Sequence, residues 1–244
     1  MTILSSPQVI HFGILIPCFN HQDRLRILLK RIAENRWRWA PNVDELLVID
    51  DGSEPPVADS FTTGEKISVI RMKTNGGKGA ALKAGFRNLL KHRRLSCIVT
   101  LDADLQHPPE YIPRFLDRYL TKNADLVLGC RKFRNSEMPW ERKLSNRLSS
   151  AVVSLVTGRK IIDSQCGYRL YSRRLLENIP LTENGFHLES EAVVRSCRKK
   201  YKIVQVAIPT IYGGEKSAIK HFMDTVNFIQ VVLGFLKDRL IGNV

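Results

Sequence analysis

The stretch Cys97-Ile98-Val99-Thr100-Leu101-Asp102-Ala103-Asp104-Leu105-Gln106 decides the fold and points to the chemistry of this chain. Its first half is an apolar run that predicts a buried strand, and its second half places oxygen-bearing side chains where that strand ends. Alternate side chains of an extended segment point the same way, so Asp102, Asp104 and Gln106 could direct their oxygens at one hard cation. A solvated acidic turn is the other interpretation, because Asp is common where a strand gives way to a loop.

Similar apolar runs alternate with helical patterns from the start of the chain to about residue 130. Five of these runs predict strands, over Phe12–Ile16, Glu45–Ile49, Ile67–Met72, Cys97–Leu101 and Asp125–Leu128. The patterns between them predict helices over Asp23–Asn35, Gly79–Lys91 and Pro109–Thr121. This alternation is typical of an α/β fold with a Rossmann-like, mainly parallel sheet flanked by helices.

Polar motifs follow four of the predicted strands. They are Pro17-Cys18-Phe19-Asn20, Asp50-Asp51-Gly52-Ser53, Asn75-Gly76-Gly77-Lys78-Gly79 and Asp102 to Gln106. Ligands of such sheets bind outside the carboxyl ends of the strands, so we expect the four loops to face one crevice. In the second motif we favour Asp51 as the carboxylate that faces it.

The glycine-rich motif lets backbone amides approach phosphates, but it fits no known fingerprint. Met72 stands in the place of the first Walker glycine, and Leu82 stands where the dinucleotide pattern has its last glycine. A substrate loop and a flexible turn that leads into a helix therefore both remain open.

The alternation becomes less regular after residue 130. A basic segment from Arg131 to Arg147 carries enough charge to bind a phosphate, although each of its residues could instead lie on a solvated helix face. Helical patterns follow over Trp140–Val156, Glu189–Lys200 and Ile219–Leu240, with a strand at Ile203–Ile208.

Two of these helical patterns carry an apolar stripe. The spacing of Trp140, Leu144, Leu148, Val152 and Leu155 predicts the buried face of the first helix. The stripe of the last helix suits either core packing or an anionic membrane surface.

Bulk properties narrow the class of protein. The chain has 244 residues and a formal net charge of +14, which favours a polyanionic partner such as nucleic acid, an anionic lipid surface or a phosphorylated substrate. No interleaved aromatic and basic strand pattern supports nucleic acid. The five cysteines are odd in number and widely spaced, which indicates neither a disulfide framework nor a zinc cluster. With no signal peptide or spanning helix in the pattern, we expect a cytoplasmic protein.

In this order the motifs resemble family 2 glycosyltransferases of the GT-A fold, particularly the dolichyl- or polyprenyl-phosphate sugar transferases. The resemblance rests on Pro17 to Asn20, Val48 to Ser53, Asn75 to Gly85 and Asp102 to Pro108, and further on Gly129-Cys130-Arg131 and Asp163 to Arg169. One departure is His21, which follows Asn20 where many members carry Glu.

The resemblance implies roles for particular residues. Asp102, Asp104 and Gln106 would hold Mg²⁺ or Mn²⁺ against the donor diphosphate. The donor-binding set would be Pro17, Phe19, Asn20, Asp51, Lys78, Asp102, Ala103 and Asp104. The acceptor-binding set would be Arg131, Arg142, Arg169 and Ser217. Asp104, Asp163, Arg131 and Arg142 would be the catalytic residues, and for a hydroxyl acceptor Glu189 or Glu191 would be a candidate base.

The resemblance also implies an activity and a domain plan. We expect an inverting hexosyltransferase that moves a sugar from a GDP- or UDP-linked donor to a polyprenyl or dolichyl phosphate at the cytosolic membrane surface. Residues 1–244 would form one GT-A domain, with a nucleotide-sugar half over about 10–130, an acceptor half over about 131–217 and an amphipathic helix over 218–244. The alternatives are a hydroxyl acceptor in a cell-envelope glycan or glycolipid, and a non-catalytic protein that binds nucleotide sugars or membrane surfaces.

Overall fold

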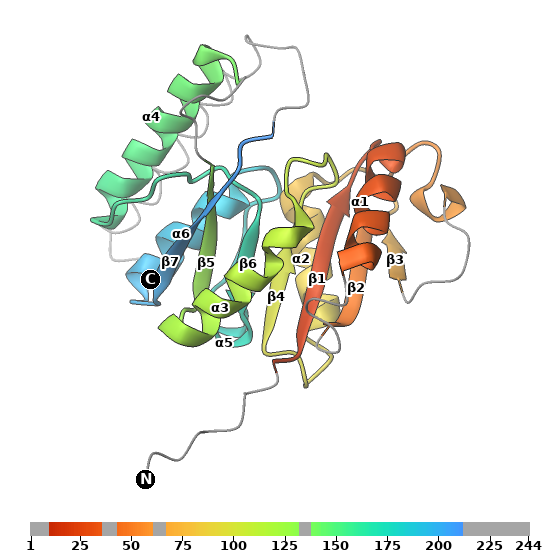
Figure 1. Cartoon of the computed structure of the whole chain (residues 1–244), viewed down its shortest axis with the longest axis horizontal. Coiled ribbons are helices and arrows are strands. Elements are labelled where there is room, and N and C mark those ends of the chain that lie inside the picture. Colours follow the sequence, from red (N-terminus) through yellow and green to blue (C-terminus); the bar gives the residue numbers. More distant parts are fainter. Residues whose placement is uncertain (1–9, 36–42, 61–66, 132–137, 212–244) are drawn as a thin grey trace.

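The computed structural model describes residues 10–35, 43–60, 67–131 and 138–211. These residues form one seven-stranded sheet of order β3-β2-β1-β4-β6-β5-β7, with helices on both faces (Figure 1). In chain order the elements are β1 Phe12–Cys18, α1 Gln22–Asn35, β2 Val43–Asp50, η2 Val57–Ser60, β3 Ile67–Arg71, α2 Lys78–Leu89, β4 Cys97–Thr100, η3 Pro109–Tyr111, α3 Ile112–Lys122, β5 Leu126–Arg131, α4 Trp140–Thr157, β6 Arg169–Ser172, α5 Arg173–Asn178, α6 Leu188–Arg198 and β7 Ile203–Ile208.

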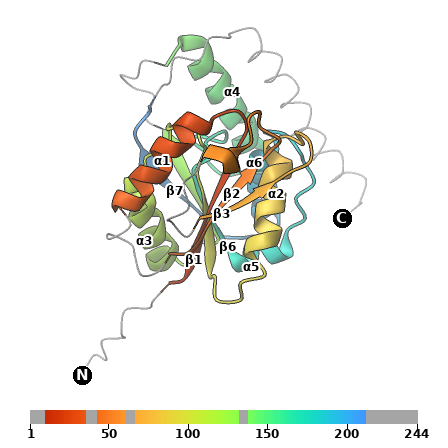
Figure 2. The ribbon, with the colours of Figure 1, turned by 90° about the vertical axis from the view of Figure 1, so that its right-hand side faces the viewer.

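The sheet separates two apolar cores. Helices α1 and α3 cover one face, while α2, α5 and α6 cover the other (Figure 2). The first core includes Leu25 of α1 and Phe115 of α3, and the second includes Phe86 of α2 and Val193 of α6. The α/β prediction and all six predicted strands are confirmed, including the one at Ile203–Ile208, which is β7. The helix predicted over Glu189–Lys200 is α6. The helix predicted from Pro109 divides into the 3-10 turn η3 and the helix α3.

Strand β6 was not predicted, and it matters most for the site. It runs antiparallel between β4 and β5, with Arg169 opposite Thr100 on one side and Leu128 on the other. Since β4 and β5 approach their carboxyl ends there, the chain that enters β6 lies beside the loop that leaves β4. The segment from Asp163 to Arg169 is thereby brought to the edge of the sheet that carries Asp102.

Helix α4 presents the opposite face to that predicted from its apolar stripe. Its buried residues are Asn146, Ser149, Ser150 and Val153. Trp140, Leu144, Leu148 and Leu155 are instead exposed, at 69%, 57%, 47% and 84%. The reason is the polar layer beneath the helix, where the Asn146 amide donates to Asp163 and the Ser150 hydroxyl contacts that of Ser164. Val153, and Val152 from the edge of the predicted stripe, pack against the apolar core. Hydrogen bonds and these apolar contacts together determine which face of the helix is buried.

None of the helices in the described ranges combines the length and apolarity needed to cross a membrane. The helix predicted from Ile219 to Leu240 lies outside the described residues.

A close contact between α2 and β1 fixes the start of α2 at the site. A Cβ built on Gly85 would lie 2.2 Å from Leu15 Cδ1, and Leu15 is fully buried. Because Leu15 has no room to retreat, only glycine allows the helix to approach this strand so closely.

We expect Gly85→Ala to destabilise the protein although alanine is the better helix former. A contact of 2.2 Å with a fully buried side chain should cost about 2–3 kcal/mol, at the upper end of the usual range for overpacking, and this exceeds the gain of about 1 kcal/mol in helix propensity. Chemical denaturation should show a net loss of about 1–2 kcal/mol in the free energy of unfolding. Arg87→Ala, on an exposed position of α2, should change it by less than about 0.5 kcal/mol. Equal stabilities for the two variants would contradict the close contact.

Candidate active site

A cavity of about 340 Å³ opens where the predicted loops leave the sheet. Its lining residues are Pro17, Cys18, Phe19, His21, Asp51, Asn75, Gly77, Lys78, Ala81, Asp102, Ala103, Asp104 and Phe186. All four predicted loops contribute to this lining, so the expected crevice is present.

The two adjacent aspartates after β2 have separate tasks. Asp50 is fully buried, accepts hydrogen bonds from the Ser53 and Val57 amides and pairs with Arg71 at 2.9 Å. Asp51 lines the cavity, and its two oxygens accept the Gly76 and Gly77 amides at 2.8 and 2.9 Å. Asp50 therefore holds its own loop together, whereas Asp51 shapes the glycine-rich loop at the wall of the cavity.

Lys78 is the central charge of the site. Its ammonium lies 2.6 Å from Asp102 Oδ1 and 2.7 Å from Glu189 Oε1, so it joins the start of α2 to the end of β4 and to α6. Burial alone would lower the pKa of Lys78, but the two carboxylates outweigh burial and raise the pKa above its ordinary value. Burial would raise the pKa of Asp102, and Lys78 reverses that effect and lowers the pKa to about 2. Both groups are thus charged at neutral pH.

Gly167, in the loop before β6, packs against this cluster. A Cβ at Gly167 would lie 2.6 Å from both Asp102 Oδ2 and Lys78 Nζ, so no larger residue fits against the ion pair. The Gly167 carbonyl also accepts the Thr100 hydroxyl at 2.8 Å. The loop before β6 is in this way packed directly onto the carboxylate that follows β4.

The carboxylates after β4 suit a divalent cation that takes further ligands from a substrate. Asp102 and Asp104 line the cavity, whereas Gln106 does not belong to the lining. Asp104 Oδ1 accepts the Gln106 amide at 2.9 Å in a tight turn. Within the described residues no group of three His, Cys, Asp or Glu side chains could hold a metal ion alone. Two carboxylates with a diphosphate match the way proteins bind Mg²⁺, which keeps few protein ligands.

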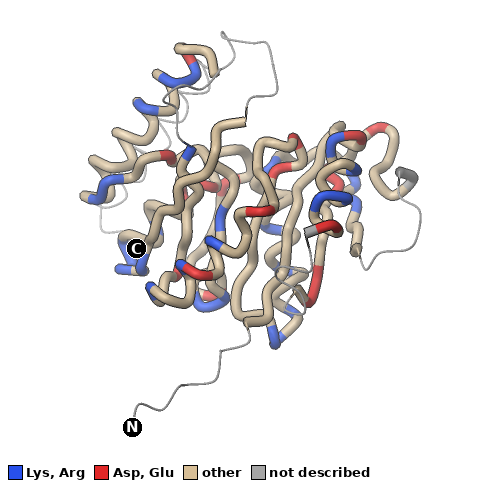
Figure 3. Tube along the Cα trace, in the orientation of Figure 1, with Lys and Arg blue, Asp and Glu red and all other residues tan. Residues whose placement is uncertain are grey.

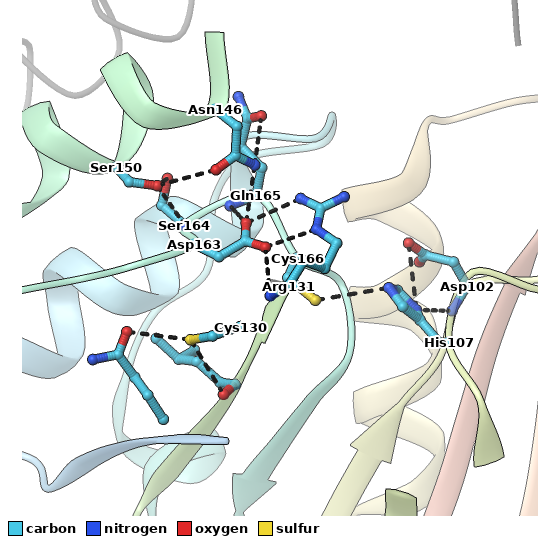
Figure 4. Close-up of polar contacts among 12 residues, drawn as sticks. Asp102, His107, Cys130, Arg131, Asn146, Ser150, Asp163, Ser164, Gln165 and Cys166 are labelled. Carbon is cyan, nitrogen blue, oxygen red and sulfur yellow. Dashed lines mark hydrogen bonds and ion pairs between the residues drawn. The ribbon is translucent and has the colours of Figure 1, made fainter. Parts of the chain in front are cut away.

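His107 fixes the loop that carries these carboxylates (Figure 4). Its Nδ1 accepts the Asp102 backbone amide at 3.0 Å, and its Nε2 lies 3.8 Å from Cys166 Sγ. Burial lowers the pKa of His107 to about 4, so the imidazole is neutral at pH 7. His107 belongs to the motif from Asp102 to Pro108, but this role could not be predicted because the contact with Cys166 depends on the unpredicted position of β6.

A second buried ion pair joins Arg131, at the end of β5, to Asp163 (Figure 4). Arg131 Nε and Nη2 donate to the two oxygens of Asp163 at 2.7 and 3.0 Å, and Asn146 donates to Asp163 at 3.0 Å. Burial would raise the pKa of Asp163, but Arg131 lowers it. Asp163 is fully buried, and these donors occupy both of its oxygens. It therefore orients Arg131 and is poorly placed to act as a base.

Several other predicted site residues lie away from the cavity lining. Arg169 is fully buried and donates to the carbonyls of Cys166, Ser164 and Glu189, so it supports the loop before β6. Glu191 accepts the Thr182 and Glu183 amides and pairs with Arg195, which gives it a structural task.

Glu189 differs from Glu191, since its carboxylate faces Lys78. Asn20 bridges two loops through Ser53 and Glu54. Arg142 lies on α4, outside the lining, and Ser217 lies outside the described residues. Phe186 does line the cavity, and sequence reasoning missed it because it stands in no recognisable motif.

The cavity lies at the carboxyl edge of an α/β sheet, where the ligands of such folds bind. Comparison with known proteins identifies the family. The model of glycosyl transferase family 2 matches residues 13–180. A polyprenol monophosphomannose synthase of Mycolicibacterium smegmatis is 30% identical over 206 residues, covering 80% of this chain and 75% of that protein. An undecaprenyl-phosphate mannosyltransferase of Micrococcus luteus is 31% identical over 204 residues, covering 80% and 81%.

The fold also matches a solved structure. Glucosyl-3-phosphoglycerate synthase of Mycobacterium tuberculosis, in complex with Mn²⁺, UDP and glucosyl-3-phosphoglycerate, superposes with a TM-score of 0.67 at 19% identity, over 94% of this chain and 80% of that one. The chain thus belongs to glycosyltransferase family 2. It has the GT-A fold and is a glycosyltransferase, with polyprenyl-phosphate sugar transferases among its relatives.

Because His107 is buried and neutral, we expect the free energy of unfolding to depend on pH. The pKa of His107 lies near 4 in the folded protein and near 6.5 when unfolded, so between these values the unfolded chain binds more protons. Its contribution is fully present above about pH 6.5 and is lost as the pH falls toward 4, by about 3 kcal/mol in total.

His107→Asn retains a hydrogen-bond acceptor but cannot titrate. Between pH 6.5 and 4, denaturant unfolding should show a shallower loss of stability for this variant than for the wild type. Parallel curves would contradict a buried neutral imidazole at this position.

Proposed function

We propose that the protein transfers a sugar from a GDP- or UDP-linked donor to a polyprenyl or dolichyl phosphate, in a reaction that depends on Mg²⁺ or Mn²⁺ at the cytosolic surface of a membrane. The observation that carries the proposal is the cavity lined by Lys78, Asp102 and Asp104, against which Gly167 of the loop before β6 is packed. The named relatives that act on polyprenyl phosphates support the choice of acceptor.

Each end of the donor has a chemical counterpart in the cavity. Phe19 offers an aromatic face for a nucleobase, and Asp51 stands at the same end near the sugar hydroxyls of a nucleoside. Lys78, the first residue of α2, offers the positive charge of its side chain and the N-terminal end of that helix to a diphosphate. A divalent cation held by Asp102 and Asp104 would stabilise the negative charge of the departing nucleoside diphosphate.

The proposed step is a direct displacement with inversion. An oxygen of the acceptor phosphate forms a bond to the anomeric carbon as the bond from that carbon to the diphosphate oxygen breaks. The bonding electrons leave with the nucleoside diphosphate, beside the Lys78 ammonium. Arg131, held in one orientation by Asp163, would position the acceptor phosphate together with Arg142.

The state of the carboxylates favours a phosphate acceptor over a hydroxyl one. A hydroxyl needs a base within hydrogen-bond reach, whereas a phosphate is already ionised at neutral pH. Asp163 and Glu191 are buried and occupied by donors, and Glu189 pairs with Lys78. A hydroxyl acceptor would therefore require rearrangement of an ion pair, while a phosphate acceptor would not.

A donor panel tests the proposal. UDP- and GDP-sugars are supplied with Mn²⁺, with and without undecaprenyl or dolichyl phosphate, and the glycosylated lipid is measured. Product should appear only when the lipid phosphate is present. Nucleotide binding without product from any donor would contradict transfer to a lipid phosphate and would leave a hydroxyl acceptor or a non-catalytic binding role.

Asp104→Asn should lower metal-dependent turnover by about 100-fold or more, because an amide binds a hard cation far less well than a carboxylate. Thermal unfolding should show that the fold is retained. Asp117→Asn, a matched change at an exposed site of α3, should leave the rate unchanged. An unaltered rate for Asp104→Asn would remove this carboxylate from the proposed metal site.

The outward face of α4 supports action at a membrane surface. It presents four large apolar side chains, and Figure 3 shows basic positions spread along the helix. An apolar stripe with an aromatic residue and flanking Lys and Arg is typical of a helix that lies on an anionic bilayer. The buried face of α4 holds Asn146 against Asp163, so a bilayer at α4 would lie near the proposed acceptor phosphate.

Replacement of both Leu144 and Leu148 by Glu should weaken binding to vesicles that contain phosphatidylglycerol by about tenfold or more, because apolar burial is replaced by repelled charge. Sedimentation with vesicles measures the bound fraction. Leu120→Glu, at an exposed apolar site on α3, is the matched control and should have little effect. Similar binding by all three proteins would exclude α4 as the docking face.

A further inference from the structure

The segment 182–187, between α5 and α6, crosses the start of α2 at the edge of the cavity. The Ala80 amide donates to the Asn184 carbonyl at 2.9 Å. The Lys83 ammonium donates to the Thr182 carbonyl and to Asn184 Oδ1, both at 2.7 Å. Two elements separated by about a hundred residues are therefore tied together at the point where the helix meets the site.

Close packing against two glycines also holds segment 182–187 at the start of α2. A Cβ on Gly79 would lie 2.7 Å from the Gly185 carbonyl oxygen, and one on Gly77 would lie 2.8 Å from the Asn184 carbonyl oxygen. From the other side, Glu191 accepts the Thr182 and Glu183 amides. Segment 182–187 is thereby held both against α2 and against α6.

This segment presents an aromatic side chain to the cavity. Phe186 lines the cavity although 73% of it is exposed, and its ring centroid lies 5.8 Å from Lys78 Nζ. Because most of the Phe186 side chain is exposed, core packing does not account for its position. Such a ring at a concave polar site is suited to contact a ligand.

The position of Phe186 relates it to one end of the donor. Phe19 and Asp51 follow β1 and β2, whereas Phe186 stands beside Lys78, which pairs with Asp102 after β4. If the diphosphate lies at Lys78 and the nucleoside at Phe19, the sugar on the outer phosphate extends away from Phe19. That places the sugar at the end of the cavity occupied by Phe186.

We propose that Phe186 forms the wall of the sugar subsite and stacks on the apolar face of the transferred sugar. This inference rests on the proposed function and adds a residue that contacts the group in transfer. The electron-rich face of an aromatic ring attracts the partly positive C–H groups of a sugar. Since segment 182–187 is fixed, the ring is already in place before the donor binds, which reduces the entropy lost on binding.

Comparison of two ligands isolates this contact. Calorimetric titration in Mn²⁺ measures the affinity for UDP and UDP-glucose, and for GDP and GDP-mannose. Phe186→Ala should weaken the binding of the preferred nucleotide sugar by about threefold to tenfold, the range expected for one aromatic contact. Its affinity for the matching free nucleoside diphosphate should stay within about twofold of wild type.

Three further variants complete the test. Phe186→Tyr keeps the ring and should restore wild-type affinity for the nucleotide sugar. Phe19→Ala should weaken the binding of the free nucleoside diphosphate and of the nucleotide sugar by the same factor, because it removes a contact with the nucleoside. Lys83→Met removes the tie to Thr182 and Asn184, so it should show a smaller form of the Phe186→Ala pattern.

Two results would overturn the inference while leaving the proposed function intact. An equal loss for both ligands in Phe186→Ala would mean that the ring acts only on Lys78 or the diphosphate. Unchanged affinity for both, with a raised KM for the lipid phosphate, would make Phe186 an acceptor contact instead. If the wild type binds none of the four ligands, the proposed function fails together with this inference.

Discussion

The ammonium of Lys78, shared between Asp102 and Glu189, is the interaction on which the site depends. It joins the first residue of α2, the loop after β4 and the first turn of α6, three elements that are distant along the chain. Two carboxylates brought this close would repel each other without a cation between them. The charge that holds these two carboxylates together also lines the cavity. Gly167 packs so tightly against Asp102 and Lys78 that the loop before β6 must follow their geometry.

The sequence predicted the half of the fold whose strands are apolar and whose loops carry compact motifs. Strands β1 to β5 and the four polar loops were placed correctly because periodicity and turn residues are local signals. Strand β6 carried no such signal, since it is four residues long and begins with Arg169. That arginine is buried only because three backbone carbonyls of the surrounding loops receive its guanidinium, and those contacts exist only in the folded chain.

Helix α4 illustrates a different limit. The spacing of its apolar residues correctly identified a stripe along the helix. Such a pattern shows which side chains share a face, but it does not show which face packs against the protein. The polar layer formed by Asn146, Ser150, Asp163 and Ser164 lies in the chain's own interior, so the helix buries its small polar face there. Unpaired, those buried groups would cost more than four exposed apolar side chains, because exposed apolar surface is common whereas unsatisfied buried polar groups are rare.

Sequence motifs identified some residues of the candidate site, and others were identified only from the structure. Motifs identified Asp51, Lys78, Asp102 and Asp104, all of which line the cavity. They also suggested Asp163, Arg169 and Glu191, but these side chains make structural contacts outside the cavity lining. Asp163 accepts from Arg131, Arg169 donates to backbone carbonyls, and Glu191 accepts backbone amides. The roles of Phe186 and His107 could not be predicted from motifs, because both depend on contacts between distant parts of the chain. His107 contacts Cys166, and the segment that carries Phe186 contacts α2. An apolar residue outside any motif becomes a candidate for function only when the structure shows that a rigid backbone holds it open beside a charged cavity. For that reason motif reasoning found the charged and glycine-rich residues of the cavity but not Phe186, whose position depends on contacts between α2 and segment 182–187 that exist only in the folded chain.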